Sequence, residues 1–198
     1  MSSATKNLED DHDYILKLID AMEAMTKSSE PDITDLEDAV DLIKSYADGL
    51  HHAKEETLLF PLMAEHGFST QQGPVAMMLH EHTQGRAFVK EMLENIELFK
   101  NGDLSALSFV YSNMLGYGEL LRNHIAKENN VLFRMADQAL PKDDQETLYK
   151  QFQEVENKCL PNRQKKDFIA RIEKLTQIYN PSYYFKSTQI INQQQFIK

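Results

Sequence analysis

The chain has 198 residues, with 21 basic and 31 acidic side chains and a formal net charge of −10. This acidic balance argues against a binding surface for nucleic acid or for an anionic membrane, which would need clustered Lys and Arg. The single cysteine, Cys159, excludes an intramolecular disulfide framework and is typical of a reducing compartment.

Residues 1–14 are polar and acidic and lack the apolar segment of a signal peptide. No apolar run approaches the about 18 residues that a membrane span requires. We therefore expect a cytoplasmic protein that binds neither nucleic acid nor membrane.

Apolar residues recur at helical spacing through almost the whole chain, which predicts an all-α protein. The expected long helices cover about residues 7–25, 34–66, 73–100 and 104–137. Shorter helices are expected over 143–157 and 162–179, before a polar tail at 181–198. Four long helices with short connections predict an antiparallel up-down four-helix bundle with additional shorter C-terminal helices. We expect this bundle domain to span residues 1–180, with its core at 8–137.

Each long helix of a bundle must bury one apolar stripe. Six polar residues interrupt the four predicted stripes: His12, His51, Glu55, His82, His124 and Glu128. After Glu55, the stripe of the second helix should continue at Leu58 and Leu62. After Glu128, the stripe of the fourth should continue at Val131 and Met135.

Burying so many titratable groups without partners would cost several kcal/mol each. A shared metal cation removes this cost, because imidazole and carboxylate are natural metal ligands. Two of the interruptions are His-x-x-x-Glu pairs, whose spacing places both side chains on one helical face. The alternative is a set of hydrogen-bonded core side chains, but two such pairs plus one histidine on each remaining helix favour a metal site.

The other histidines fall outside these stripes. His52, like Glu56, is expected on a solvated helix face, and so is His80. His66 is expected at a helix end, where a cationic side chain complements the helix dipole.

The motifs that carry these residues resemble those of the hemerythrin-like (HHE) cation-binding family, single-domain prokaryotic type. The matching segments are "LEDDHDYIL", "HHAKEETLLFP", "GPVAMMLHEHTQGR" and "LLRNHIAKENNVLF". The resemblance implies a four-helix bundle around two non-haem iron ions, bridged by two carboxylates, with an oxo or hydroxo bridge left open. Carried over by motif, the ligands are His12, His51, Glu55, His82, His124 and Glu128.

The chain departs from the oxygen-carrying hemerythrins at the third helix. Those proteins have a fifth histidine four residues from the first, and Met78 and Arg86 occupy the corresponding positions here. A further ligand would have to be water or another side chain, and four candidates remain: Glu9, His52, Tyr117 and Glu119.

Two classes of function remain open. The first is a binding protein that takes up O2, NO or peroxide for storage, delivery or sensing. The second is a di-iron oxidoreductase acting on the same ligands, or a donor of iron for iron–sulfur cluster repair. The sequence has no second cofactor motif, so an enzyme would need an external electron donor, and we favour binding. Manganese in place of iron and a homodimer are also left open.

Overall fold

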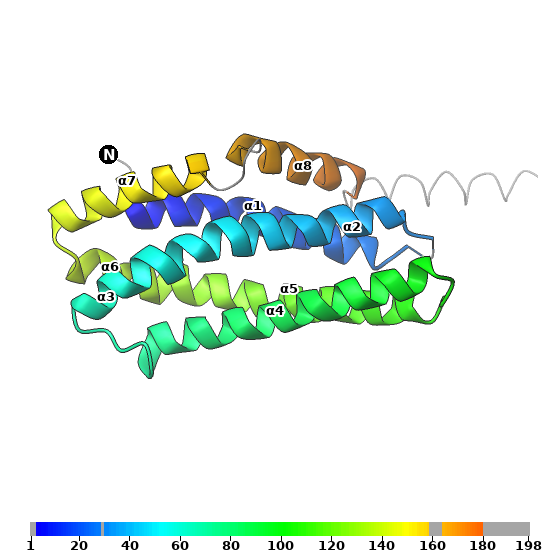
Figure 1. Cartoon of the computed structure of the whole chain (residues 1–198), viewed down its shortest axis with the longest axis horizontal. Coiled ribbons are helices and arrows are strands. Elements are labelled where there is room, and N and C mark those ends of the chain that lie inside the picture. Colours follow the sequence, from blue (N-terminus) through cyan, green and yellow to red (C-terminus); the bar gives the residue numbers. More distant parts are fainter. Residues whose placement is uncertain (1–2, 29, 159–163, 180–198) are drawn as a thin grey trace, which may run out of the picture.

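The computed structural model describes residues 3–28, 30–158 and 164–179, and the elements within them are helical (Figure 1). In chain order they are α1 (Ala4–Met25), α2 (Ile33–Leu42), η1 (Ile43–His52), η2 (Glu55–Leu59), α3 (Phe60–Glu65), α4 (Gly73–Lys100), α5 (Ala106–Lys127), η3 (Glu128–Leu132), α6 (Phe133–Ala139), α7 (Lys142–Lys158) and α8 (Lys165–Ile178). The three η elements are π-helical segments inside longer helical rods, so α2 to α3 form one rod and α5 to α6 another.

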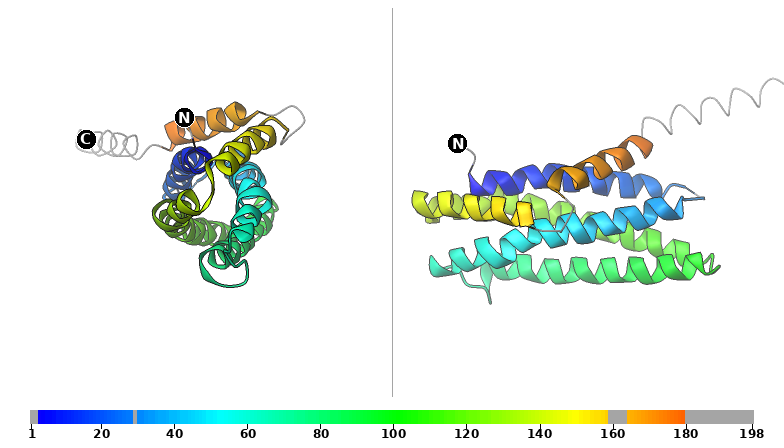
Figure 2. Two further views of the ribbon diagram at one scale, coloured as in Figure 1. Left: turned by 90° about the vertical axis from the view of Figure 1, so that its left-hand side faces the viewer. Right: turned by 45° about the horizontal axis from the view of Figure 1, so that its top comes forward.

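The four long rods form an antiparallel bundle, which confirms the predicted all-α fold (Figures 1 and 2). α7 and α8 lie outside this bundle, where both pack against α1. The polar tail predicted at 181–198 lies outside the described residues. Among the residues that the structure describes, no helix combines the length and apolar character needed to cross a bilayer.

Glycine and proline mark the helix ends. Gly67, which follows α3, and Gly73, which begins α4, have φ values of 92° and 77°, a backbone region that glycine enters without strain. Pro74 lies in the first turn of α4, where a missing N–H costs no hydrogen bond. Pro61 is the second residue of α3, directly after η2.

A buried polar layer divides the apolar core in two. One apolar cluster contains Ile15 and Leu50, and the other contains Leu8 and Leu59. The polar residues predicted to interrupt the stripes lie between these clusters along each rod. The burial of so many titratable side chains in this layer requires a chemical explanation.

The π-helical segments shift the buried face of two rods by one residue. After Glu55 the fully buried side chains include Leu59 and Met63, whereas the predicted Leu58 and Leu62 are only partly buried against the same apolar cluster. After Glu128 the buried positions likewise include Leu132 and Ala136, while Val131 is 49% exposed. A π turn holds more residues than an α turn, so the residues beyond it face a different direction. The predictions from a regular helical period were wrong at these positions for that reason.

Candidate metal centre

The six side chains predicted to bind metal are all fully buried in the polar layer, and each rod contributes at least one. They fall into two groups of possible metal ligands. One group is His12, His51, Glu55 and Glu128, and the other is His52, Glu55, His82 and His124. Within each group the candidate ligand atoms lie within 4.8 Å of one another. Glu55 belongs to both.

The imidazoles face each other in two pairs. His12 Nε2 lies 3.0 Å from His51 Nε2, and His82 Nε2 lies 3.1 Å from His124 Nε2. Two neutral imidazole lone pairs at such distances repel unless a proton or a metal cation lies between them. A cation bound by both nitrogens would remove the repulsion.

The two carboxylates each span both imidazole pairs. The Glu55 oxygens lie 3.5 Å from His51 Nε2 and 3.5 Å from His82 Nε2. The Glu128 oxygens lie 3.2 Å from His12 Nε2 and 3.2 Å from His124 Nε2. None of these four buried oxygens has a hydrogen-bond partner. Because unsatisfied buried carboxylates are costly, the donor set fits two cations, with each carboxylate able to contact both.

Without a cation, the pKa values of these buried groups are shifted from their usual range. Burial and the charge of Glu128 raise the pKa of Glu55 well above its usual range. Burial and the nearby His12 lower the pKa of His51 to about 3, which keeps it neutral, as a metal ligand must be. Burial opposes the charged form of His124, but the carboxylates of Glu128 and Glu81 raise its pKa to about 9. In the metal-free protein His124 therefore keeps a proton, and its positive charge balances Glu128 in place of a metal cation.

The outer nitrogens of the imidazoles donate to nearby oxygens. His12 Nδ1 donates to Asn129 Oδ1 at 2.7 Å, and His124 Nδ1 donates to Glu81 Oε2 at 2.9 Å. With a cation bound, such hydrogen bonds would keep the proton on Nδ1 and leave the Nε2 lone pair for the metal, which is the tautomer that coordination requires.

Glu56 accepts the corresponding hydrogen bond from His82, on the third rod. Its Oε1 accepts a hydrogen bond of 2.7 Å from His82 Nδ1, and it pairs with Arg86 at 2.8 Å. The expectation that Glu56 lies on a purely solvated face was wrong, because the helical rods bring it against α4.

His52 was also expected on a solvated face, and this too was wrong: it is 5% exposed. Its position at the end of π-helical η1 lets two consecutive residues, His51 and His52, face the interior. The His52 ring stacks on that of His82, with centroids 3.8 Å apart and planes 16° apart, and its Nδ1 lies 3.3 Å from Asp48 Oδ1. The signal in the sequence was the doublet "HH" itself.

Of the other candidates for a further ligand, neither carboxylate, Glu9 or Glu119, joins either group. Glu9 pairs with Arg134, and Glu119 is exposed. Tyr117 is buried in α5, where it lines the cavity beside the second group. His80 is exposed, as expected, and His66 lies at the C-terminal end of α3, also as expected, where it contacts Asp144 on α7.

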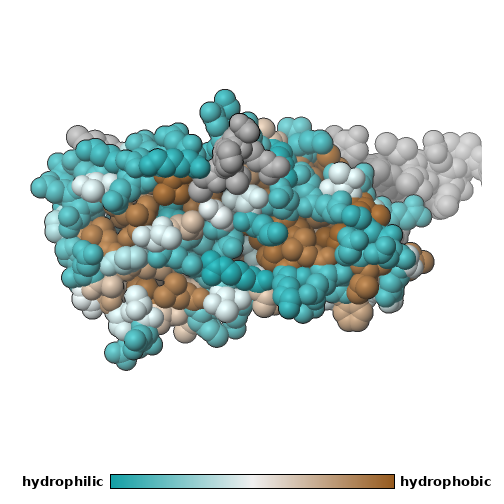
Figure 3. All heavy atoms as spheres, in the orientation of Figure 1, coloured by the Kyte–Doolittle hydropathy of each residue, from teal (hydrophilic) through white to brown (hydrophobic). Residues whose placement is uncertain are grey.

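A cavity of about 240 Å³ leads to the second ligand group. His52, His82 and His124 line it, together with an apolar wall that includes Ile43, Val89 and Leu121. Apolar side chains are also visible at the surface between the α2–η1 rod and α4 (Figure 3). Gly85 leaves room here, since a Cβ at this position would meet only the Tyr117 ring, at 3.5 Å.

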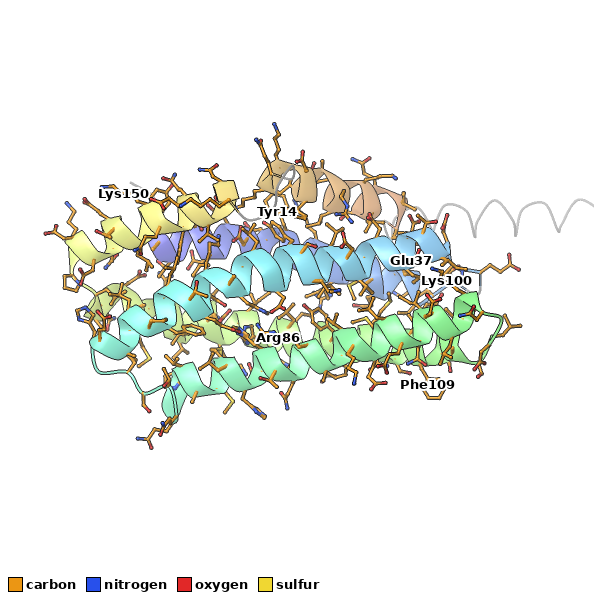
Figure 4. The ribbon with its side chains drawn as sticks, in the orientation of Figure 1. Tyr14, Glu37, Arg86, Lys100, Phe109 and Lys150 are labelled. Atoms are coloured by element: carbon orange, nitrogen blue, oxygen red, sulfur yellow. The ribbon has the colours of Figure 1, made fainter. Side chains whose placement is uncertain are left out.

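Arg86 lies at the edge of this cavity, where it extends from α4 toward the neighbouring rod (Figure 4). Its guanidinium pairs with Asp48 at 2.6 Å as well as with Glu56. Met78, the other residue at the position of the absent fifth histidine, is buried in the apolar core.

Comparison with known proteins agrees with this geometry. Residues 3–136 match the family model described as hemerythrin HHE cation binding domain. No curated protein and no solved structure matches the chain. The match covers more than half of the chain and all the residues of both ligand groups, and it ends before α7. The chain belongs to the hemerythrin HHE cation-binding domain family.

Proposed function

We propose that the chain is a cytoplasmic non-haem di-iron protein that binds O2 or a related small ligand, NO or peroxide, for storage, delivery or sensing. The observation that carries this proposal is the set of four buried carboxylate oxygens without partners, facing four imidazole Nε2 atoms. Mixed imidazole and carboxylate donors without thiolate suit iron better than a thiolate-preferring metal. Iron bound here would supply open coordination positions and Fe2+/Fe3+ redox chemistry.

The protein's own groups have distinct parts in this function. His12 and His51 would hold one metal, and His82 and His124 the other, with Glu55 and Glu128 shared between them. His52 is proposed as the seventh donor, on the second metal, in place of the histidine absent from α4. The apolar cavity beside that metal would admit a small neutral ligand while its walls exclude bulk water.

Metal analysis with optical spectroscopy tests the proposal. Protein produced in iron-replete cells should contain about two iron ions per chain, as the shared donor set requires. Oxygen admitted to the reduced, anaerobic protein should give a lasting new absorption band. One tightly held zinc per chain would contradict the di-iron assignment. Two irons with rapid bleaching and release of peroxide would instead favour the oxidoreductase alternative.

A further inference from the structure

A buried charge cluster links the metal centre to the two C-terminal helices. At its centre the Asp11 carboxylate, which is fully buried, receives three donors. Lys54 Nζ lies 2.5 Å from Asp11 Oδ2, while Tyr46 Oη and Lys165 Nζ lie 3.0 and 2.6 Å from Oδ1. Lys54 is also fully buried. Asp11 is therefore held in one orientation from three sides.

The same carboxylate faces a proposed metal ligand. Asp11 Oδ2 lies 3.5 Å from His51 Nδ1, a nitrogen that has no other partner. This distance is long for a hydrogen bond, so Asp11 acts on the imidazole chiefly through its charge. A negative charge behind a ligand imidazole makes it a stronger electron donor to its metal.

The C-terminal helices supply the remaining charges. Lys165 is the first residue of α8, and Glu156 lies on α7. Glu156 Oε1 accepts from Lys54 at 2.9 Å and from Lys165 at 2.9 Å. Both helices lie beyond the residues that match the family model, yet their side chains reach the layer directly behind His51.

The other half of the centre has a similar but simpler arrangement. Glu81 accepts from His124 Nδ1 and pairs with Lys127, as Asp11 faces His51 and pairs with Lys54. Lys127 is 42% exposed at its side chain, and the two residues that Glu81 contacts among those described, His124 and Lys127, both lie on α5. Behind His51 and His124, the two halves thus differ in the charges that the C-terminal helices contribute to the first of them.

We propose that α7 and α8 tune the electron affinity of the metal position formed by His12 and His51, with Lys165 as a positioning residue acting through Asp11. The inference rests on the proposed di-iron centre. The Lys165 charge offsets that of Asp11 and so favours Fe2+ at this position. Without it the net charge behind His51 is more negative, which favours Fe3+.

Redox titration of the full-length, iron-loaded protein, followed by Mössbauer spectroscopy, tests this tuning. Lys165→Met should lower the midpoint potential of one iron. Asp11→Asn and Glu156→Gln, which remove negative charge at nearly constant shape, should raise it. Lys166→Met is the matched control, because Lys166 is the exposed neighbour on α8 and its loss changes the net charge equally. Lys127→Met should act on the other iron.

Opposite signs separate charge tuning from a structural role. If Lys165→Met matches Lys166→Met, or if Lys165→Met and Asp11→Asn shift the potential in the same direction, the inference is wrong. If circular dichroism shows that Lys165→Met loses helix content, Asp11→Asn and Glu156→Gln provide the test instead. Unchanged midpoint potentials in both of these variants would overturn the inference. A wild-type chain without two irons would instead contradict the proposed function itself.

Discussion

The imidazole rings of His52 and His82 stack face to face, with their centroids 3.8 Å apart. With His52, the second ligand group contains three imidazoles, whereas the first contains two. This difference traces to one pair of related motifs. The second rod reads "HHAKE" and the fourth "HIAKE", so Ile125 occupies the position that corresponds to His52. The two metal positions are therefore unequal by one side chain.

Replacing His52 tests whether it is the seventh donor. His52→Gln should weaken metal binding at one position by about tenfold or more, a loss typical of groups that hold metal ligands. Mössbauer doublets that become more alike would be the expected sign, because both irons would then have two imidazoles. His80→Gln, which removes an exposed histidine, is the control. An unchanged spectrum in His52→Gln would show that this imidazole only lines the cavity.

The two shared carboxylates should each be needed for metal. Glu55→Ala or Glu128→Ala leaves an incomplete donor set at both positions, so we expect most of the iron to be lost on elemental analysis. Exposed carboxylates on the same helical rods, Glu65 and Glu119, provide the controls. Glu56 is unsuitable as a control because it contacts His82. If the exposed and buried variants retain equal iron, the proposed ligand set is wrong.

The cavity beside the second ligand group should control ligand entry. Gly85 lines the cavity and a Cβ there would be in ordinary contact with the Tyr117 ring alone, so Gly85→Leu should extend its side chain into the cavity and shrink it. Azide or NO binding, followed by stopped-flow absorbance, should slow by about tenfold, which corresponds to about 1.4 kcal/mol of added barrier. Ala87→Leu adds a leucine on the exposed side of α4 and should leave the rate unchanged. Equal rates in both variants would mean that ligands reach the metal by another route.

Metal removal should destabilise the fold. Binding to the native state alone adds about 4 kcal/mol when free metal is 1,000 times its Kd, and for a chain of this size that raises Tm by roughly 10 °C. Thermal melts followed by circular dichroism, with and without a chelator, measure the difference. Equal melting temperatures would contradict the idea that the buried carboxylates depend on a cation.

The difference in Tm between metal-loaded and metal-free protein should also depend on pH. In the metal-free protein the pKa of His124 is raised from 6.5 to about 9. Its proton therefore stabilises the metal-free fold fully below pH 6.5, and this contribution is lost as pH rises to about 9. Burial also raises the pKa of Glu55, which acts in the same direction. The Tm gap between loaded and metal-free protein should widen from pH 6.5 to 9.

Melts at several pH values check this prediction. The Tm of metal-free His124→Gln should not decline between pH 6.5 and 9, whereas that of metal-free His80→Gln should decline as in the wild type. A gap that narrows as pH rises would contradict the assigned proton.

The sequence by itself determined the all-α bundle, because long amphipathic periods leave few other ways to bury four apolar stripes. It also determined the six polar interruptions, since a buried His-x-x-x-Glu pair is recognisable from spacing alone. Family motifs in "HHAKE" and "HIAKE" then indicated the metal.

Only the tertiary structure decided which way the residues around those motifs face. The π-helical segments carry His52 inward, replace Leu58 by Leu59 in the core and turn Val131 outward. A regular period cannot foresee such a local change, because the extra residue in a π turn is fixed by packing in three dimensions. The contacts of Lys165 with Asp11 and of Glu156 with Lys54 were equally hidden, since each joins residues more than 100 positions apart in the chain through the packing of α7 and α8 against the bundle.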